Sequence, residues 1–325
     1  MTVPTHAQLI KAQADLQRHS LTYLTSMSLR CAIELGIPTA IHRFGGTASL
    51  PDLMAALSLP PPKAPFLGRV LRLLAKSDAL ACTEDGVYSL TPLSYILVDG
   101  VLIDGEARQI AFPLAVTSRY HMESGLGMAD WFKNDRALPV PSPFEHVHAA
   151  APFDESMTLL DPETDKLFYE ALAAHDHMGI GTVVRECRGL FNGLQSLTDC
   201  CGGDGTTARA IVKAFPHIKC NVLDLPKLVL HFWSDEDCIK ILAQCKEAIP
   251  SRETGGKVII IDIVLGSSLE TISETELLMD MLMFICTRGR QRDEKEWSTI
   301  FTKAGFSGYK IVKKLGHRGV IEVYP

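Results

Sequence analysis

Residues 197–226 of the chain read LTDCCGGDGTTARAIVKAFPHIKCNVLDLP, and this stretch decides the fold. Residues 197–201 and 220–223 are short apolar runs of the kind that form buried strands. Between them lie a glycine-rich turn and a run with helical spacing that ends before Pro216, because proline disfavours helix at the preceding residue. Thr206 or Thr207 is expected to cap that helix. The pattern predicts a strand, a turn, a helix and a second strand, in that order.

This layout indicates a ligand that carries adenosine. Glycine has no Cβ and tolerates positive φ, so Gly202, Gly203 and Gly205 let a ligand approach the backbone closely. Asp224 ends the second strand, about 20 residues after the turn, where an acid accepts hydrogen bonds from ribose hydroxyls. The motif does not separate NAD, FAD and S-adenosylmethionine (SAM), but Ala208 in place of a third glycine favours SAM. A glycine turn without such a ligand is the alternative.

Composition excludes several classes of partner. A net charge of −6 over 325 residues argues against general nucleic-acid binding. The chain has no run of about 18 apolar residues, so no membrane span is expected, and its N-terminus lacks the apolar segment of a signal peptide. Its nine cysteines are scattered and include no C-x-x-C pair, which predicts reduced thiols in a cytoplasmic protein.

The N-terminal part has the pattern of a winged helix. Several helical runs precede two short strands, residues 80–83 and 87–90, which flank the hairpin signal Asp85-Gly86. One interpretation is DNA binding; the other is a module for dimerisation or for covering a substrate pocket. The acidic balance of the chain favours the second, since a fold does not decide a function. The basic residues that would contact phosphates are Lys63, Arg69, Arg72 and Lys76.

A proline-rich break at residues 138–152 marks the expected domain boundary. We therefore expect a helical domain over residues 1–155 and an α/β domain over residues 156–325. The second domain contains further strand and helix patterns and ends in what looks like an antiparallel pair, which is typical of a methyltransferase sheet. Those strand patterns cover residues 257–264, 309–314 and 319–324.

Further segments carry a family resemblance. They include IELGIPTAIHRFGG (33–46), LHFWSDEDCIKILAQCKEAIP (230–250), GGKVIIIDIVLG (255–266) and RDEKEWSTIFTKAGFS (292–307). With residues 197–226, they make nearly the whole chain resemble the plant O-methyltransferases of the caffeic acid and flavonoid type, most closely the grass branch. The resemblance implies an α/β class I SAM-methyltransferase sheet of Rossmann type and an N-terminal, mostly helical winged-helix dimerisation domain. It also implies a homodimer that transfers a methyl group from SAM to a phenolic hydroxyl of a small secondary metabolite, without a metal.

The resemblance also assigns roles to residues. His231 is the general base; Asp262 and Gln291 stand where many members have glutamates beside the base, and Met283 where a methionine holds the substrate. A phenol with a pKa of about 10 is a poor nucleophile at neutral pH, so a histidine that titrates near 7 helps to deprotonate it. The residues assigned to SAM are Asp199, Gly203, Gly205, Asp224 and Leu225.

The chain departs from the family pattern after Asp224. Only nine residues separate Asp224 from Ser234, where the family has a helix, a third strand and a fourth strand that leads to the base. A crossover between parallel strands needs about a dozen residues. We therefore expect the third and fourth strands to be missing, residues 229–233 not to form the usual strand, and His231 to be displaced. Methyl transfer that is weak or lost is the consequence; a non-catalytic dimerising member or the product of a truncated gene model is the alternative.

Smaller departures lie close to the expected site. Cys201 replaces the first glycine of the turn, Asp204 adds a negative charge near the expected cofactor, and Phe232 replaces the aspartate that follows the base. A second candidate site consists of the histidine pairs 146/148 and 175/177, which would suit a metal. Residues 175 and 177 fall in a helical stretch, where side chains two positions apart diverge, so a metal is not expected.

Overall fold

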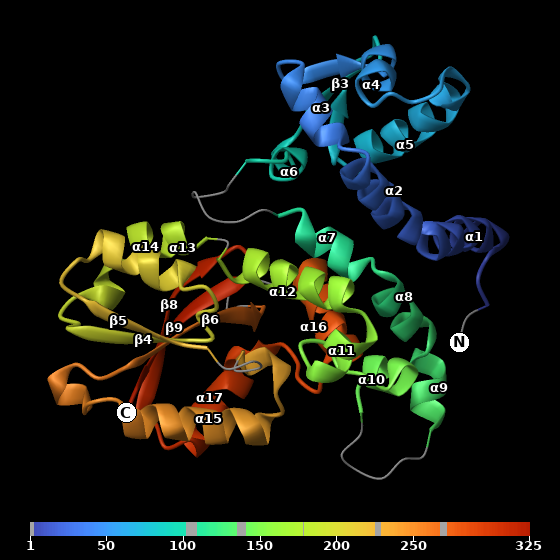
Figure 1. Ribbon diagram of the computed structural model, residues 1–325. Helices are drawn as coiled ribbons and strands as arrows, with labels where there is room; N and C mark the ends of the chain where they lie inside the picture. The colour runs from blue at the N-terminus through green and yellow to red at the C-terminus, as the bar shows by residue number, and fades with distance from the viewer. Residues whose placement is uncertain (1–2, 102–108, 135–140, 178, 225–228, 267–271) are drawn as a thin grey trace. The chain divides into compact units, whose positions relative to one another are not determined.

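The computed structural model describes residues 3–101, 109–134, 141–177, 179–224, 229–266 and 272–325 of the chain. Its contacts divide it into two compact units, Met1–Thr117 and Ser118–Pro325 (Figure 1). This division lies nearer the N-terminus than the boundary expected at residue 155. Each unit has a hydrophobic core of its own.

Unit 1 is mostly helical and contains one small antiparallel sheet, in the order β1-β3-β2. The expected hairpin is present: Leu80 pairs with Leu90 and Cys82 with Tyr88, and Gly86 between them has a φ of +76°. The side chains of Ile41, Leu53 and Leu71 are fully buried against this sheet and its helices. The helices are α1 (His6–Leu21), α2 (Tyr23–Glu34), α3 (Ile37–Arg43), α4 (Leu50–Ala56), η1 (Pro61–Lys63), α5 (Ala64–Lys76), α6 (Pro92–Tyr95) and α7 (Ala111–Val116). The strands are β1 (Thr47–Ser49), β2 (Leu80–Cys82) and β3 (Val87–Leu90).

Unit 2 contains two sheets in its described residues. One is a parallel pair, β4 (Ser196–Cys200) and β5 (Lys219–Leu223). The other has the order β7-β6-β9-β8, in which β9 lies antiparallel between β6 and β8, so the antiparallel pair expected at the C-terminus is present. Its strands are β6 (Val258–Leu265), β7 (Arg292–Asp293), β8 (Gly308–Leu315) and β9 (Arg318–Tyr324).

Helices cover both faces of this second sheet. Side chains alternate along β6 and β9, so apolar residues point to each face and need a covering layer there. Ile259 and Val320 pack on the side of α13 and α14, whereas Ile260 and Ile321 pack on the side of α15 and α17 (Figure 1). The helices of unit 2 before β4 are α8 (Arg119–Leu126), α9 (Met128–Lys133), α10 (Pro143–His148), α11 (Glu155–Leu160), α12 (Pro162–His177), α13 (Ile180–Glu186) and η2 (Arg188–Phe191). Those after β4 are α14 (Thr206–Ala214), η3 (Leu230–Phe232), α15 (Asp235–Ala248), η4 (Arg252–Thr254), α16 (Glu274–Cys286) and α17 (Glu294–Lys303).

The short connection after β5 has the expected effect on the sheet. Leu230–Phe232 form a single 3₁₀ turn and not a strand, with Phe232 N–H donating to the carbonyl of Val229 at 3.0 Å. In the described part of the chain only this turn, α15 and η4 come between β5 and β6. Because no strand there bridges them, β4-β5 and β6-β9 belong to separate sheets.

Candidate active site

His231 and Asp262 form a buried pair. His231 lies in the 3₁₀ turn η3 and is 5% exposed; Asp262 lies on β6 and is 6% exposed. Their side chains meet with Nδ1 and Oδ1 2.8 Å apart, and the same Oδ1 accepts the backbone N–H of Ile263 at 2.7 Å. An ionised carboxylate only accepts hydrogen bonds, so opposite an ionised Asp262 a neutral His231 has its proton on Nδ1 and its lone pair on Nε2.

Gly289 sets the position of the backbone at this turn. A Cβ atom at Gly289 would lie 2.0 Å from the carbonyl oxygen of His231 and 2.5 Å from the carbonyl carbon of Phe232. Real Cβ contacts are never that short, so the loop after α16 approaches the turn as closely as it does because residue 289 is a glycine. The sequence alone gave no signal for this role.

Gln291, at the end of this loop, and Met283, on α16, are both buried. The side chain of Gln291 is 2% exposed, and neither its amide nitrogen nor its oxygen has a hydrogen-bond partner among the described residues. Its backbone N–H donates to Oδ1 of Asp280 at 2.8 Å. Met283 is 5% exposed. A buried amide without a partner is uncommon in folded proteins, which makes Gln291 a candidate for binding a polar group of a ligand.

Aromatic rings surround the histidine on one side. The ring of Phe232 stacks on that of Phe153, with centroids 5.3 Å apart and an interplanar angle of 15°, and meets the ring of His231 edge-on at 4.9 Å. Phe153 in turn contacts Tyr169, with centroids 5.4 Å apart. Phe153 has a φ of +60°, which is uncommon for a bulky residue. No sequence pattern points to Phe153. Phe232, which stands where the family has an aspartate, is part of this apolar cluster.

The electrostatics of Tyr169 connect this cluster to Asp224. Burial raises the pKa of the Tyr169 phenol, and the negative charges of Asp165, Asp154 and Asp224 raise it further. Asp224 is exposed at the end of β5, close enough to Tyr169 to act on its charge. The charge of Asp224 thus acts on Tyr169, whose ring contacts Phe153 of the aromatic cluster.

The glycine turn has the geometry that the sequence predicts. Gly203 and Gly205 have φ values of +50° and +79°, which residues with a Cβ rarely adopt. β4 and β5 pair in parallel with Cys200 opposite Leu223, so the turn after β4 and Asp224 after β5 follow the same edge of the sheet. Positive-φ glycines and an acid at one edge fit an adenosine-bearing cofactor. Leu225 lies outside the described residues.

Packing against β5 explains why residue 202 is also a glycine. A Cβ at Gly202 would lie 2.6 Å from Oδ2 of Asp199 and 2.8 Å from Cγ1 of Val222. The carboxylate of Asp199 thus lies directly under the turn.

The start of α14 differs from the expectation in one respect. Gly205, not a threonine, is the N-cap, and Thr206 is the first helical residue. Asp204, the residue before the N-cap, accepts the backbone N–H of Thr206 with its Oδ1 at 2.9 Å. Its other oxygen lies 3.4 Å from Nη2 of Arg209, so the charge that Asp204 adds to the turn is compensated within the chain. The expectation of a Thr206 or Thr207 cap was wrong because the αL conformation at residue 205 needs glycine.

The described part of the chain holds neither a metal-binding cluster nor a membrane-spanning helix. No three His, Cys, Asp or Glu side chains gather there as a metal site would require. None of its helices is long and apolar enough to cross a membrane.

Solved structures with the same fold are methyltransferases. A methyltransferase of calicheamicin biosynthesis, in its S-adenosylhomocysteine-bound form, matches with a TM-score of 0.79 and 21% identity over 97% of this chain and 99% of its own. Human N-acetylserotonin methyltransferase in complex with SAM matches with a TM-score of 0.72 and 17% identity, over 100% and 99%. These likenesses define the fold as that of a class I SAM methyltransferase with an N-terminal helical domain.

Sequence comparison identifies the family. An O-methyltransferase domain matches residues 126–230 and 227–307, and an O-methyltransferase dimerisation domain matches residues 17–100. The chain belongs to the SAM-dependent O-methyltransferase family. The resemblance to grass members is confirmed: a flavonoid O-methyltransferase-like protein of Oryza sativa subsp. japonica is 55% identical over 363 residues, 99% of this chain and 97% of its own, and daphnetin O-methyltransferase 1 of Secale cereale is 57% identical over 350 residues, 97% and 99%. Trans-resveratrol di-O-methyltransferase of Vitis vinifera is 38% identical, over 98% of each chain.

The matches also locate the missing segment. The family domain matches in two parts that meet at residues 227–230, the place where the sequence lacks a crossover. The alignment with the Oryza relative spans 363 positions, more than the 325 residues of this chain.

Proposed function

We propose that this chain methylates a phenolic hydroxyl of a small plant metabolite, with SAM as methyl donor and His231 as general base. The observation that carries the proposal is the buried hydrogen bond of 2.8 Å between Nδ1 of His231 and Asp262. Several relatives support the choice of a phenol by their names, which mention daphnetin, resveratrol and 8-hydroxyquercetin.

The chemistry follows from the tautomer of His231. Asp262 accepts a hydrogen bond from Nδ1–H, which leaves the basic lone pair on Nε2 for a substrate. The same carboxylate stabilises the imidazolium that forms when Nε2 takes the phenol proton. The phenolate is then the nucleophile, and its attack on the methyl group depends mainly on alignment. Gln291 has no acidic group, so its role is to hydrogen-bond the substrate oxygen and not to take the proton.

The proposed cofactor residues are those of the glycine turn. Gly203 and Gly205 would bring the backbone close to SAM, Asp199 lies under the turn, and Asp224 would accept the ribose hydroxyls. SAM, when bound, would supply an electrophilic methyl group on a sulfonium, from which a neutral thioether departs as a good leaving group.

The proposed substrate residues are apolar. Phe153 and Phe232 offer aromatic faces beside His231, and Met283 offers a flexible thioether that adapts to a planar ring. Together they favour an aromatic substrate over a sugar or a peptide.

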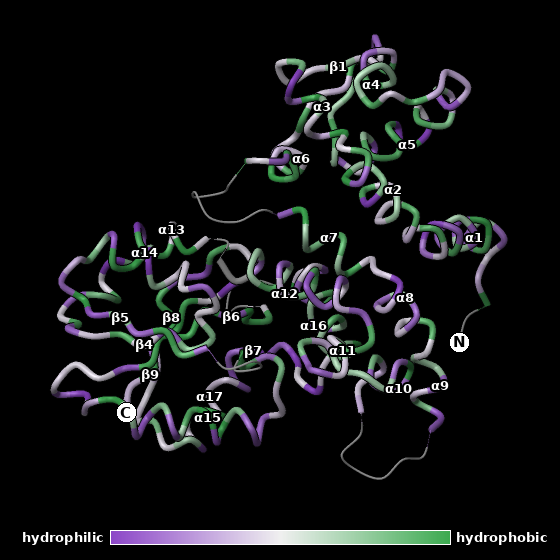
Figure 2. Tube along the Cα trace, viewed as in Figure 1, coloured by the Kyte–Doolittle hydropathy of each residue, from purple (hydrophilic) through white to green (hydrophobic). Residues whose placement is uncertain are grey.

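We also propose that unit 1 forms a homodimer, as the matched dimerisation domain suggests. None of the residues of α1 is buried in the single chain, although the helix carries large hydrophobic side chains. Those that are between 52% and 66% exposed are Leu9, Ile10, Leu16 and Leu21. These hydrophobic residues recur along the helix (green in Figure 2). An apolar face of this kind is stable in water when a second copy covers it. With nine free cysteines, such a dimer suits the reducing cytoplasm.

The test separates cofactor binding from catalysis. Calorimetry measures SAM binding to the purified protein, and mass spectrometry measures the methylation of a coumarin, a stilbene and a flavonol. We expect SAM binding and slow methylation of at least one phenol, because a 3₁₀ turn and not the usual strand carries the base. In His231→Asn we expect a further loss of roughly 10²-fold or more in kcat with little change in SAM affinity. SAM binding without methylation of any phenol would contradict the assignment of His231, and a folded protein that does not bind SAM would be a non-catalytic family member.

A further inference from the structure

Arg292 is the most deeply buried charged residue beside the proposed base. Its side chain has no exposed surface, and it lies on β7 (Arg292–Asp293), where it pairs in parallel with Val264 of β6. Asp262, the partner of His231, lies two residues earlier on the same strand. The guanidinium also lies 5.3 Å from the ring centroid of Trp297. A guanidinium taken out of water needs a full set of partners to compensate for its lost hydration.

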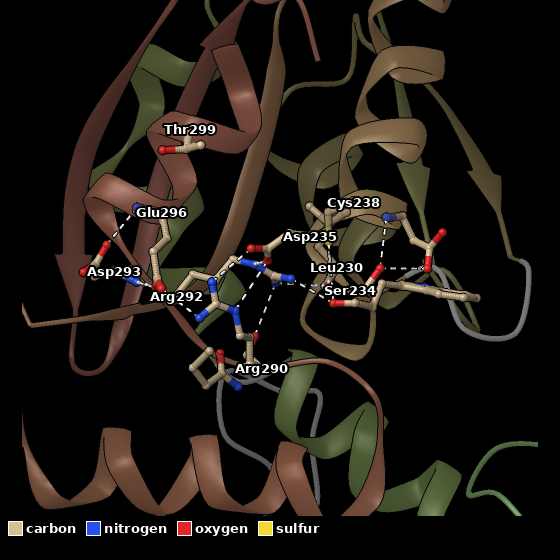
Figure 3. A network of polar contacts seen from close by, with 12 residues as sticks. Leu230, Ser234, Asp235, Cys238, Arg290, Arg292, Asp293, Glu296 and Thr299 are labelled. Atoms are coloured by element: carbon tan, nitrogen blue, oxygen red, sulfur yellow. Dashed lines mark hydrogen bonds and ion pairs between the residues drawn. The ribbon is translucent and has the colours of Figure 1, made fainter. Parts of the chain in front are cut away.

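Two of those partners are backbone carbonyls that flank His231. Nη2 of Arg292 donates to the carbonyl of Trp233 at 2.8 Å, and Nη1 donates to the carbonyl of Leu230 at 3.4 Å (Figure 3). The carbonyl of Leu230 also accepts the thiol of Cys238 at 3.1 Å. Residues 230–232 form a 3₁₀ turn, so no strand ladder holds them in the described structure. Side-chain donors take the place of that ladder, and Arg292 is the charged one.

Besides the carbonyl of Arg290, which accepts from Nη1 at 3.3 Å, Arg292 has a partner that joins the turn to the next helix. Nε donates to Oδ1 of Asp235, the first residue of α15, at 2.8 Å. Arg290 binds the other oxygen of Asp235 at 3.0 Å and Oε1 of Glu296 at 2.8 Å, but its side chain is 45% exposed (Figure 3). Arg290 therefore shares the acid with Arg292, whereas of these two arginines Arg292 alone is seen to donate to the carbonyls of Leu230 and Trp233. This makes Arg290 a matched comparison.

We propose that Arg292 is a positioning residue that holds the η3 turn against β6, so that the His231 ring meets Asp262. The inference rests on the proposed role of His231 as base. Arg292 lies on β7, which pairs with β6, and its side chain reaches the η3 turn from there. It therefore sets the distance between η3, which carries His231, and β6, which carries Asp262. It contacts neither reacting atom; it acts through the backbone of the histidine.

The test measures the histidine directly and needs no turnover. The Nδ1–H proton of His231 is followed by NMR in protein with labelled histidine, and its signal is assigned by its loss in His231→Gln. In Arg292→Met we expect this proton to exchange with water roughly tenfold faster or more, because charged hydrogen bonds that restrain the turn are lost. In Arg290→Met we expect an unchanged rate, within about twofold, because that variant removes an ion pair to the same acid and no bond to the turn.

Folding and activity are controlled separately. Thermal unfolding shows whether each variant is folded; if Arg292→Met is not, Arg292→Lys decides, because lysine keeps the charge but not the planar fork that reaches several acceptors at once. An unchanged exchange rate in folded Arg292→Met, or in folded Arg292→Lys where that variant decides, overturns the proposal. An acceleration in Arg290→Met equal to that in the Arg292 variant overturns it too. If the protein methylates a phenol, kcat should fall in Arg292→Lys while the KM for SAM stays the same. If it does not, the proposed function fails, but the exchange rates still decide the role of Arg292.

Discussion

Cys200 stands at the C-terminal end of β4, one residue before the non-glycine position of the turn. Cys200 is exposed as a residue, but its thiol lies against the thiol of Cys245 in α15 and accepts a hydrogen bond from it. This bond lowers the pKa of Cys200 to about 7, although burial and the charge of Asp199 act in the opposite direction. The same bond, together with burial, raises the pKa of Cys245, so Cys245 keeps its proton.

The reactivity of Cys200 is therefore expected to depend on pH in a particular way. The thiolate is the reactive form, and it predominates above pH 7 when the pKa is about 7. We predict that the alkylation rate of Cys200 by iodoacetamide, followed by peptide mass spectrometry, rises with a midpoint near pH 7. In Cys245→Ala the midpoint should move up toward about 8.5, the value of an ordinary thiol. Cys82, exposed in unit 1, serves as the control, and a midpoint that does not move in Cys245→Ala would contradict the prediction.

At the scale of elements, the decisive contact is between the loop after α16 and the η3 turn. Gly289 lies against the carbonyl of His231, and Arg292 holds the same turn from β7. The turn that carries the proposed base is thus positioned by residues about 60 positions later in the chain. A larger side chain at residue 289 must therefore displace either the η3 turn or the loop itself.

Substitution of Gly289 by alanine tests this contact. The added Cβ would lie 2.0 Å from the carbonyl oxygen of His231, so we predict that Gly289→Ala lowers the free energy of unfolding by about 1–3 kcal/mol. The matched control is Gly125→Ala in α8, where a Cβ meets no atom within 4 Å, and where alanine should be neutral or should stabilise by up to about 1 kcal/mol. Urea denaturation measures both. Equal stability of the two variants would show that the loop yields without cost.

At the scale of the whole molecule, the two units have different tasks. Unit 2 holds all the described residues of the proposed site, and unit 1 contains the matched dimerisation domain. Contiguous apolar surface is costly to hydrate, so we expect a second chain, and not solvent, to cover the exposed apolar side chains of α1.

Light scattering after size exclusion tests that assembly. We predict a dimer for the natural sequence and a shift of at least about tenfold in the dissociation constant, toward monomer, for Leu16→Glu, because a buried charge without a partner opposes association. Leu159→Glu places the same charge on α11 of unit 2, where the side chain is 78% exposed, and should leave the dimer intact. A monomeric natural protein would contradict the prediction, as would an unchanged dimer in Leu16→Glu.

Much of the fold could be predicted from contiguous residues. The βαβ unit around the glycine turn, the hairpin at Asp85-Gly86 and the closing pair β8-β9 are all present, because strand alternation and turn chemistry act between neighbours in sequence. The break in the sheet also followed from a count of residues, since nine of them cannot form a parallel crossover and a strand. Family resemblance, not periodicity, singled out His231, Asp262 and Gln291.

The sequence by itself determined which elements form, where the glycine turn lies and that the sheet is divided. Only the tertiary structure decided that His231 contacts Asp262, 31 residues away, that Phe153 stacks on Phe232, and that Arg292 binds the turn. The physical reason is the range of the forces involved. Local hydrogen bonds and side-chain periodicity act within a few residues. These contacts arise only when β6, β7, η3 and the segment between α10 and α11 pack together, and that packing is not encoded in any short segment.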